Sequence, residues 1–222
     1  MEPLTPSQVR VLGCLIEKAL TTPEYYPLTL NSLTTACNQK SNRNPMVSYD
    51  DKTVVRALDG LRQIALAAQV LSSDARVPKY KHNFGPALQL TDAQVVLLCE
   101  LMIRGPQTLG ELRGHCKRMH DFNDLAEVEA TLQKLMDRPE PLVKQLPRQI
   151  GFKESRYAHL LAGEPQEEND FSSNGNIRLE SAALEVQEEN LRIAQLEEQM
   201  AELRDELAAL RAEFRDFRKQ FE

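Results

Sequence analysis

The chain has 222 residues, of which 41% are hydrophobic and 27% charged, and its net charge is −6. This length suffices for one large domain or two small ones, and the composition is that of a globular protein. No apolar run approaches the roughly 20 residues of a membrane-spanning helix, and the first residues lack the pattern of a signal peptide, so we expect a cytoplasmic protein with no membrane partner.

The negative charge is concentrated toward the C-terminus. Residues 1–90 hold ten Lys/Arg against seven Asp/Glu, and residues 91–163 hold ten of each. Residues 164–222 hold seven Lys/Arg against sixteen Asp/Glu. Any surface that binds nucleic acid is therefore expected in the first of these segments.

The cysteine and histidine patterns do not indicate a metal centre or a disulfide framework. The four cysteines are scattered without CxxC pairs, which in a cytosolic chain favours buried small apolar residues. Cys116 lies near His115 and His120, but the spacing is not that of a zinc site. The chain also contains no GxSxG, Walker, GxGxxG or HExxH motif, so we expect no catalytic residues, no metal and no cofactor.

The first 162 residues contain the same unit twice. The two copies share four blocks in the same order, which indicates a tandem duplication with insertions between the blocks. The matching blocks are LTPSQVRVL (4–12) and LTDAQVVLL (90–98), TLNSLTTAC (29–37) and TLGELRGHC (108–116), Val54, Leu58 and Leu61 with Val128, Leu132 and Leu135, and KYKH (79–82) and RYAH (156–159).

Each copy predicts three helices followed by a two-stranded hairpin. Thr5 or Thr91 can cap a first helix whose apolar side chains fall on one face, and a short second helix follows in the next block. The third helix is expected to be capped by Asp50 in one copy and by Asn123 or Asp124 in the other. Two strand-like runs then close each copy.

The predicted fold class is mainly α with small β-hairpins (α+β), because three helices and a hairpin are the elements of a winged helix-turn-helix. Two tandem domains of this kind are expected, at residues 1–88 and 89–162. Four hairpin residues shared by the copies are expected to hold the hairpins on the helices, not to perform chemistry: Tyr80, Tyr157, His82 and His159.

Three segments resemble the YceH family of uncharacterised bacterial proteins. They are LTPSQVRVLGCLIEKALTTPEYYPLTLNSL, CNQKSNRNP and RMHDFNDLAEVE, and the resemblance covers about residues 4–161. The resemblance implies tandem winged helices, which agrees with the internal repeat. It implies no activity that could be assigned to single residues.

The remainder of the chain predicts a linker and a long coiled-coil helix. Residues 163–178 combine Gly, Pro, Ser, Asn and acids, which is typical of a flexible acidic linker. Residues 179–222 show a seven-residue apolar repeat, and opposite charges at the facing e and g positions favour a parallel homodimer over a tail that folds back or a lone helix. The candidate dimerisation residues are Ile193, Leu196, Met200, Leu203, Leu207, Leu210, Phe214 and Phe217.

The first copy carries the residue types of a DNA-binding surface. Winged helices can place their third helix in the major groove and their hairpin on the backbone, as other helix-turn-helix proteins dock. Lys and Arg suit phosphate, Arg can bond guanine with two donors, and Asn can do the same for adenine. The candidate DNA-binding residues are Lys40, Asn42, Arg43, Asn44, Lys52, Arg56, Arg76, Lys79 and Lys81.

Two features favour a purely structural loop before the third helix instead. Asp50 and Asp51 begin that helix, where acids stabilise the helix but repel DNA. The residues SNRNP are also good turn formers, and the residue before Pro45 avoids helical geometry. Contact with double-stranded DNA and a polar capping loop therefore both remain open.

The second copy is a poorer DNA candidate, because Asp121, Asp124, Glu127 and Glu129 line the start of its third helix. A role in contacting other proteins suits this copy better. Two hypotheses follow from the sequence. The chain is either a non-enzymatic, dimeric, DNA-associated regulator that uses its first copy, or a scaffold whose modules bind other proteins without DNA.

Overall fold

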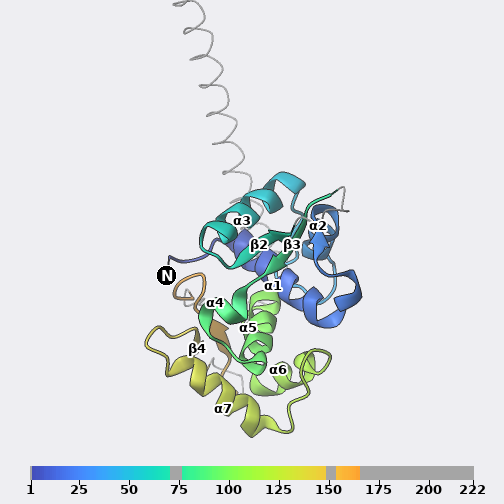
Figure 1. The fold of residues 1–222 in the computed structure, drawn as a ribbon. Coiled ribbons are helices and arrows are strands. Elements are labelled where there is room, and N and C mark those ends of the chain that lie inside the picture. Colours follow the sequence, from blue (N-terminus) through green and yellow to red (C-terminus); the bar gives the residue numbers. More distant parts are fainter. Residues whose placement is uncertain (1, 71–76, 149–153, 166–222) are drawn as a thin grey trace, which may run out of the picture. The chain divides into compact units, whose positions relative to one another are not determined.

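The computed structural model describes residues 2–70, 77–148 and 154–165, which all belong to one compact unit (Figure 1). The predicted coiled coil and all but the first three residues of the predicted linker lie outside the described residues. Helices and small antiparallel sheets make up the unit, so the α+β class is confirmed. The elements are α1 (Pro6–Thr21), η1 (Pro23–Tyr25), β1 (Leu28–Thr29), α2 (Leu30–Cys37), α3 (Asp51–Gln63), β2 (Ala67–Val70), β3 (Lys79–His82), α4 (Phe84–Leu88), α5 (Asp92–Arg104), α6 (Leu109–Cys116), α7 (Leu125–Met136), β4 (Val143–Gln145) and β5 (Tyr157–His159).

The order of elements repeats, as the sequence blocks predict. The first half, residues 2–88, has the helices α1, α2 and α3 followed by the hairpin β2–β3. The second half, residues 89–165, has α5, α6 and α7 followed by the hairpin β4–β5. The short helix α4 leads from the first half into the second, and the backbone N–H of Leu4 bonds the carbonyl of Leu161 at 2.7 Å.

A third strand joins the first hairpin, a single bridge stands in its place at the second, and the sequence analysis predicted neither. In the first half β1 adds to the hairpin, giving the strand order β1-β3-β2, with Leu28 opposite Tyr80. In the second half the equivalent residue Gln107 forms a single bridge with Tyr157. The two tyrosines therefore have the same partner position in both halves. A strand of only two residues is too short to show an alternating pattern.

Side-chain caps fix where the helices begin. Thr5 accepts a hydrogen bond from the backbone of Gln8 at 3.3 Å, and the Gln8 side chain accepts one from the backbone of Thr5 at 2.8 Å. Thr91 and Gln94 repeat this capping box at α5. Asp50 caps α3, and Asp124 caps α7. The predicted caps are confirmed. For α7 the sequence allowed either Asn123 or Asp124, and the cap is Asp124.

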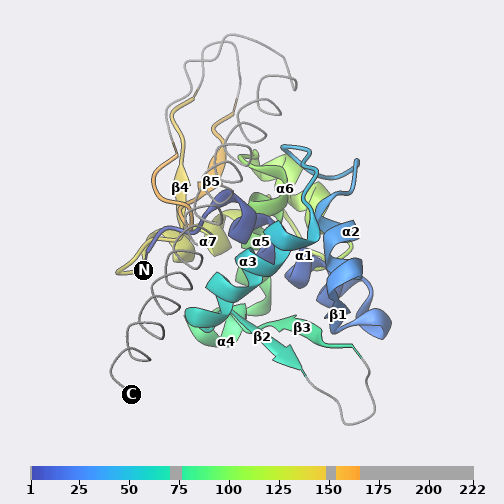
Figure 2. The same ribbon diagram turned by 90° about the horizontal axis from the view of Figure 1, so that it is seen from above.

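The core lies between α1 and α5, the equivalent first helices of the two halves. Every residue from Val9 to Ile16 is buried, and so is every residue from Gln94 to Ile103. The sequence predicts one buried face for each helix, but both are enclosed on all sides because each helix contacts its own half and the other half (Figures 1 and 2). Gly13 permits the approach: a Cβ there would lie 3.0 Å from Cγ1 of Ile103.

The hairpins are held on the helices by the tyrosines and histidines that the two halves share. Tyr80 and Tyr157 are buried. The hydroxyl of Tyr26 accepts a hydrogen bond from the backbone of His82 at 2.6 Å, and the Nδ1 atom of His82 accepts one from the backbone of Phe84. These contacts agree with the packing role predicted from the sequence.

His159 carries a buried nitrogen that has no hydrogen-bond partner among the described residues. This atom is Nδ1, and it is removed from solvent. Burial lowers the pKa of the His159 imidazole from its ordinary 6.5 to about 4, because a charged ring would lose its hydration. His159 therefore stays neutral in the folded protein at neutral pH.

We expect alanine to have opposite effects at two helical glycines. Gly13→Ala should lower the free energy of unfolding by about 1 kcal/mol, because the new methyl group would press on the buried Ile103 and Met102. Gly114→Ala should raise it by about 0.5–1 kcal/mol, because that position in α6 is open and alanine favours the helix. Urea denaturation of both variants measures the difference, and equal effects would contradict the close contact of α1 and α5.

The free energy of unfolding should fall as the pH drops from about 6.5 toward 4, in part because of His159. In that range the unfolded chain binds a proton at this residue and the folded chain does not. Between pH 7 and pH 5 the loss from His159 should be roughly 2 kcal/mol. Urea denaturation at the two pH values should show a smaller loss for His159→Asn than for the unchanged protein. His120→Asn, outside the hairpins, is the control, and identical losses in all three proteins would contradict the assignment.

Candidate nucleic-acid interface

The loop between α2 and α3, residues 38–50, is closed by one side-chain amide. Asn38 donates from Nδ2 to the carbonyl of Tyr49 at 2.8 Å, and its Oδ1 accepts from the backbone N–H of Tyr49 at 2.8 Å. The Asn38 side chain thus bonds both the N–H and the carbonyl of Tyr49, as the backbone of a neighbouring strand does. Tyr49 is itself buried, so the two ends of the loop are tied together at the surface of the core.

Arg43 points from this loop into the protein. Its side chain has no exposed surface. Nη2 lies 2.6 Å from Oε2 of Glu17 on α1, and Nη1 lies 3.2 Å from Oε1 of the same carboxylate. The remaining bonds of the guanidinium run to the carbonyls of Ala36 and Asn42 and to Oε1 of Gln39.

Arg43 and Glu17 are both ionised. Burial disfavours the charged form of Arg43, but the hydrogen bond to Glu17 and the nearby negative groups outweigh it and raise the pKa of the guanidinium. Burial also disfavours ionised Glu17, but the hydrogen bond and charge of Arg43 lower the pKa of that carboxyl. Arg43 and Glu17 therefore form a buried, two-pronged ion pair.

The prediction that Arg43 contacts DNA is wrong for this reason. A guanidinium enclosed by a carboxylate and two carbonyls cannot also meet a base edge or a phosphate. A continuous positive face through Arg43, Arg56 and Lys79 therefore does not form.

The same loop also joins the first half to the second. The backbone N–H of Asn44 donates to the carbonyl of Ile103 at 2.9 Å, in the last turn of α5. The carbonyl of Pro45 accepts from Nη2 of Arg10 at 2.5 Å. Arg10 is buried in α1 and was not singled out from the sequence. The loop is therefore a structural connection whose backbone closes the end of a helix in the other half.

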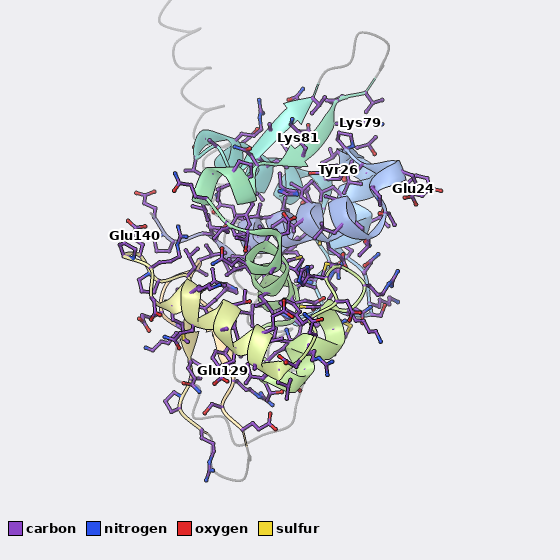
Figure 3. The ribbon with its side chains drawn as sticks, turned by 60° about the horizontal axis from the view of Figure 1, so that its bottom comes forward. Glu24, Tyr26, Lys79, Lys81, Glu129 and Glu140 are labelled. Carbon is purple, nitrogen blue, oxygen red and sulfur yellow. The ribbon has the colours of Figure 1, made fainter. Side chains whose placement is uncertain are left out.

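The remaining predicted DNA-binding residues fall into three groups. Lys40, Asn42 and the side chain of Asn44 are exposed on the loop, at the N-terminal end of α3. The other two groups lie on α3 and on the hairpin, and Figure 3 shows the two hairpin lysines near Tyr26. Lys52 and Arg56 are exposed one turn apart on α3, Lys81 is exposed and Lys79 half-exposed on β3, and Arg76 lies outside the described residues.

The charges of Lys40, Lys52, Arg56, Lys79 and Lys81 are unpaired among the described carboxylates. Successive side chains of a strand alternate between its faces, so the two hairpin lysines share the outer face while Tyr80 is buried on the other. Lys52 and Arg56 share one face of α3, because residues four apart are neighbours on a helix. These two pairs are the cationic groups best placed to meet an anionic partner.

The two carboxylates at the start of α3 accept hydrogen bonds from neighbouring threonines. Asp50 Oδ1 accepts a hydrogen bond from the backbone N–H of Thr53 at 2.8 Å. Hydrogen bonds from the side chain and the backbone of Thr53 lower the pKa of Asp50. Asp51 Oδ1 accepts from the hydroxyl of Thr34 at 2.7 Å. Both carboxylates therefore serve the fold of α2 and α3, although their charge remains near Lys52.

The equivalent surface of the second half is acidic. Asp124 caps α7, and Glu127 accepts from the backbone and side chain of Asn123 at 2.8 and 2.9 Å. Glu129 is exposed on the same helix (Figure 3). Leu125 is also exposed there, with 47% of its surface accessible. This surface repels phosphate and suits a protein partner better.

The described residues offer no metal centre and no membrane span. No three His, Cys, Asp or Glu among them are grouped so as to hold a metal ion. His115 instead bonds Gln107 at 2.6 Å, and Cys116 is buried. None of the described helices is both long and apolar enough to cross a membrane.

Comparison with known proteins gives one family. The family model described as "Protein of unknown function, DUF480" matches residues 4–152. A UPF0502 protein of Geobacter sulfurreducens is 56% identical over 220 residues, which are 99% of this chain and 98% of that protein. A UPF0502 protein of Koribacter versatilis is 55% identical over 158 residues, 71% of this chain and 73% of that protein. The resemblance to an uncharacterised bacterial family, drawn from the sequence, is confirmed.

Arg43→Ala should lower the free energy of unfolding by about 3 kcal/mol, because it leaves the largely buried Glu17 carboxylate with Lys18 alone as its cationic partner and removes the donors to the carbonyls of Ala36 and Asn42. Lys40→Ala, three residues from it along the chain and exposed, should change that free energy by less than about 0.5 kcal/mol. Urea denaturation of both variants measures the two effects. Equal stability of the two variants would contradict the structural role of Arg43.

Proposed function

We propose that this chain, which belongs to the DUF480 family, is a non-enzymatic, dimeric protein that binds double-stranded DNA through α3 and the β2–β3 hairpin. One observation carries the proposal. Lys52 and Arg56 on α3, together with Lys79 and Lys81 on β3, are exposed or half-exposed cations that form no ion pair with a described carboxylate, although the charge of Asp50 lies near Lys52 and Arg56. Such cations are the groups that hold the phosphate backbone.

The order of elements supports the proposal. Three helices and a sheet of order β1-β3-β2 are the elements that we expect of a winged helix-turn-helix. In that arrangement α3 would enter the major groove, and the outer face of β3 would follow the backbone. Arg56 would be the best placed side chain for a guanine edge, because a guanidinium can bond O6 and N7 together.

The second half would support the first without contacting DNA. Its equivalent helix α7 is acidic at Asp124, Glu127 and Glu129, and it would be repelled by phosphate. The predicted coiled coil, which lies outside the described residues, would pair two chains. Two weak cationic surfaces on one duplex bind more strongly together because the second binds at a high effective concentration.

The second candidate function is a scaffold that binds proteins instead of DNA. The observation in its favour is the surface of α7, where Leu125 is exposed beside acidic side chains. An exposed leucine with charged neighbours would supply the apolar centre and the polar rim of such a contact. The charges of Asp50 and Asp51 near Lys52 also favour this alternative.

We expect the full chain to bind random-sequence duplex DNA at low salt, with affinity falling as salt rises. The double variant Lys52→Ala/Arg56→Ala should weaken binding and reduce the slope of log affinity against log salt by about 1.8, or 0.9 for each lost phosphate contact. Fluorescence anisotropy over a salt series measures both. Lys117→Ala/Arg118→Ala removes the same charge from the second half and is the matched control.

The outcomes separate the two functions. Unchanged binding in the control, with loss in the α3 variant, supports the proposal. No binding at low salt, or equal losses in both variants, contradicts it and favours the scaffold. A chain ending at Pro165, which lacks the predicted coiled coil, should sediment as a monomer and bind more weakly than the full chain.

A further inference from the structure

The second half lacks most of the cations that the first half presents on α3 and β3. By the block alignment, three of these residues are replaced by alanine, while the fourth, Lys79, corresponds to Arg156. The three, each with its counterpart, are Lys52 with Ala126, Arg56 with Ala130, and Lys81 with Ala158. Ala126 and Ala130 are exposed, so they do not serve the core of the second half. The face of α7 that corresponds to the cationic face of α3 is therefore small and uncharged at the same positions.

A leucine and an acid complete this face of α7. Leu125 is exposed, and Glu129 is exposed and forms no ion pair with a described cation. Leu125 and Glu129 are one helical turn apart, as are Ala126 and Ala130, so all four lie on one side of the helix. We call these four residues the α7 strip. The helix contains one cation, Lys134, which lies a turn beyond Ala130. The strip is therefore apolar and acidic.

The charge of the strip selects its partner. Two copies of the strip would repel each other, because Glu129 would face a second Glu129. A fitting partner carries cations one turn apart, as α3 does with Lys52 and Arg56. The aliphatic stems of these two side chains can lie on the small alanines while their charged ends reach Glu129. Asp59, on the same side of α3, is already paired with Arg62 at 3.0 Å.

The two faces are too far apart to meet within one chain. Helix α3 packs on α1, and α7 packs on α5 and α6. Because α1 and α5 lie between them, α3 and α7 are at opposite ends of the described unit (Figure 1). A cationic α3 that reaches the α7 strip must therefore belong to a second copy of the chain.

We propose that the α7 strip of one copy docks on the cationic face of α3 and β3 of a second copy. The docking itself needs no DNA. Its consequence rests on the proposed function: the docked copy would cover Lys52 and Arg56, so docking and DNA would compete for the same face. The predicted coiled coil, which lies outside the described residues, would hold the second copy at a high effective concentration, so that a weak contact is sufficient.

Carbodiimide crosslinking of the full chain at low salt tests the docking, because this reagent joins a carboxylate to an amine only where the two are in contact. A link between Glu129 and Lys52 should appear in a covalent dimer on a denaturing gel, with the joined peptides identified by mass spectrometry. A link within one chain would run as a monomer. The yield should fall when salt is raised to about 1 M, where charges are screened beyond about 3 Å.

Charge variants at exposed positions sharpen the test. Glu129→Lys should lower the yield of linked dimer on the order of tenfold, because it places like charges opposite each other. Glu140→Lys makes the same change in charge beyond the end of α7 and is the matched control, which should keep the yield (Figure 3). Arg56→Glu combined with Glu129→Lys should restore a link, now between positions 56 and 129. Restoration by exchanged charges is not expected of residues that only support the fold.

The docking is overturned if no link to Lys52 forms at low salt, if Glu129→Lys and Glu140→Lys give equal yields, or if the exchanged charges restore nothing. A link from Glu129 to a lysine outside α3 and β3 also contradicts it, since the copies would then touch elsewhere.

Random-sequence duplex separates the docking from the proposed function. Added duplex should lower the yield of the link between Glu129 and Lys52 in the full chain. A chain that forms the link but binds no duplex supports the docking and contradicts DNA binding. A chain that binds duplex without forming the link overturns the docking alone. Bound duplex that leaves the yield unchanged shows that the two do not compete.

Discussion

A guanidinium removed from water must find acceptors for its N–H groups, and Arg43 finds them on three parts of the chain. Nε bonds Ala36 in α2, Nη1 bonds Asn42 in its own loop, and both terminal nitrogens bond Glu17 in α1. Satisfying all of these groups fixes the path of the loop. Because that path is fixed, Asn44 and Pro45 reach the end of α5 and the side chain of Arg10. The contact of this loop with the second half thus depends on one ion pair, in addition to the packing of α1 against α5.

This constraint separates structural cations from those that are free to bind a partner. Arg10 and Arg43 are buried, and their charges stabilise the loop and the neighbouring groups of α1 and α2. Lys52 and Arg56 lie outside this set, on the solvent face of α3. A count of Lys and Arg along the first half includes both the buried, structural cations and the exposed ones. Only the exposed kind contributes to attraction for a polyanion, so the proposed interface is smaller than the sequence alone indicates.

Local patterns in the sequence were enough to predict the repeat and the three main helices of each half, although not η1 or the short helix α4. Thr5, Thr91 and Asp50 are caps whose partners lie three residues away, and such short-range signals survive in a single sequence. The burial of Arg43 could not be predicted in this way. Its partner Glu17 lies 26 residues earlier, and nothing in SNRNP distinguishes an arginine that turns inward from one that faces DNA. Strand β1 was missed because a strand of two residues is too short to show an alternation of apolar and polar residues in the sequence.

Equivalent positions in the two halves show why a polar loop is a poor sign of DNA binding. By the block alignment Arg10 corresponds to Val96, and Glu17 to Ile103, so these two buried charges have no counterpart in the second half, which buries Glu100 beside Arg104 instead. The second half nevertheless has a polar connection before α7. There Arg113 donates to the carbonyls of Phe122 and Asn123, which holds the connection in place without a buried ion pair.

Each loop is polar because its backbone carbonyls need donors, whatever the surface beyond it binds. What differs between the halves is the charge of the helix that follows, cationic at Lys52 and Arg56 but acidic along α7. The argument for DNA therefore rests on that helix and the adjacent hairpin, and not on the loop.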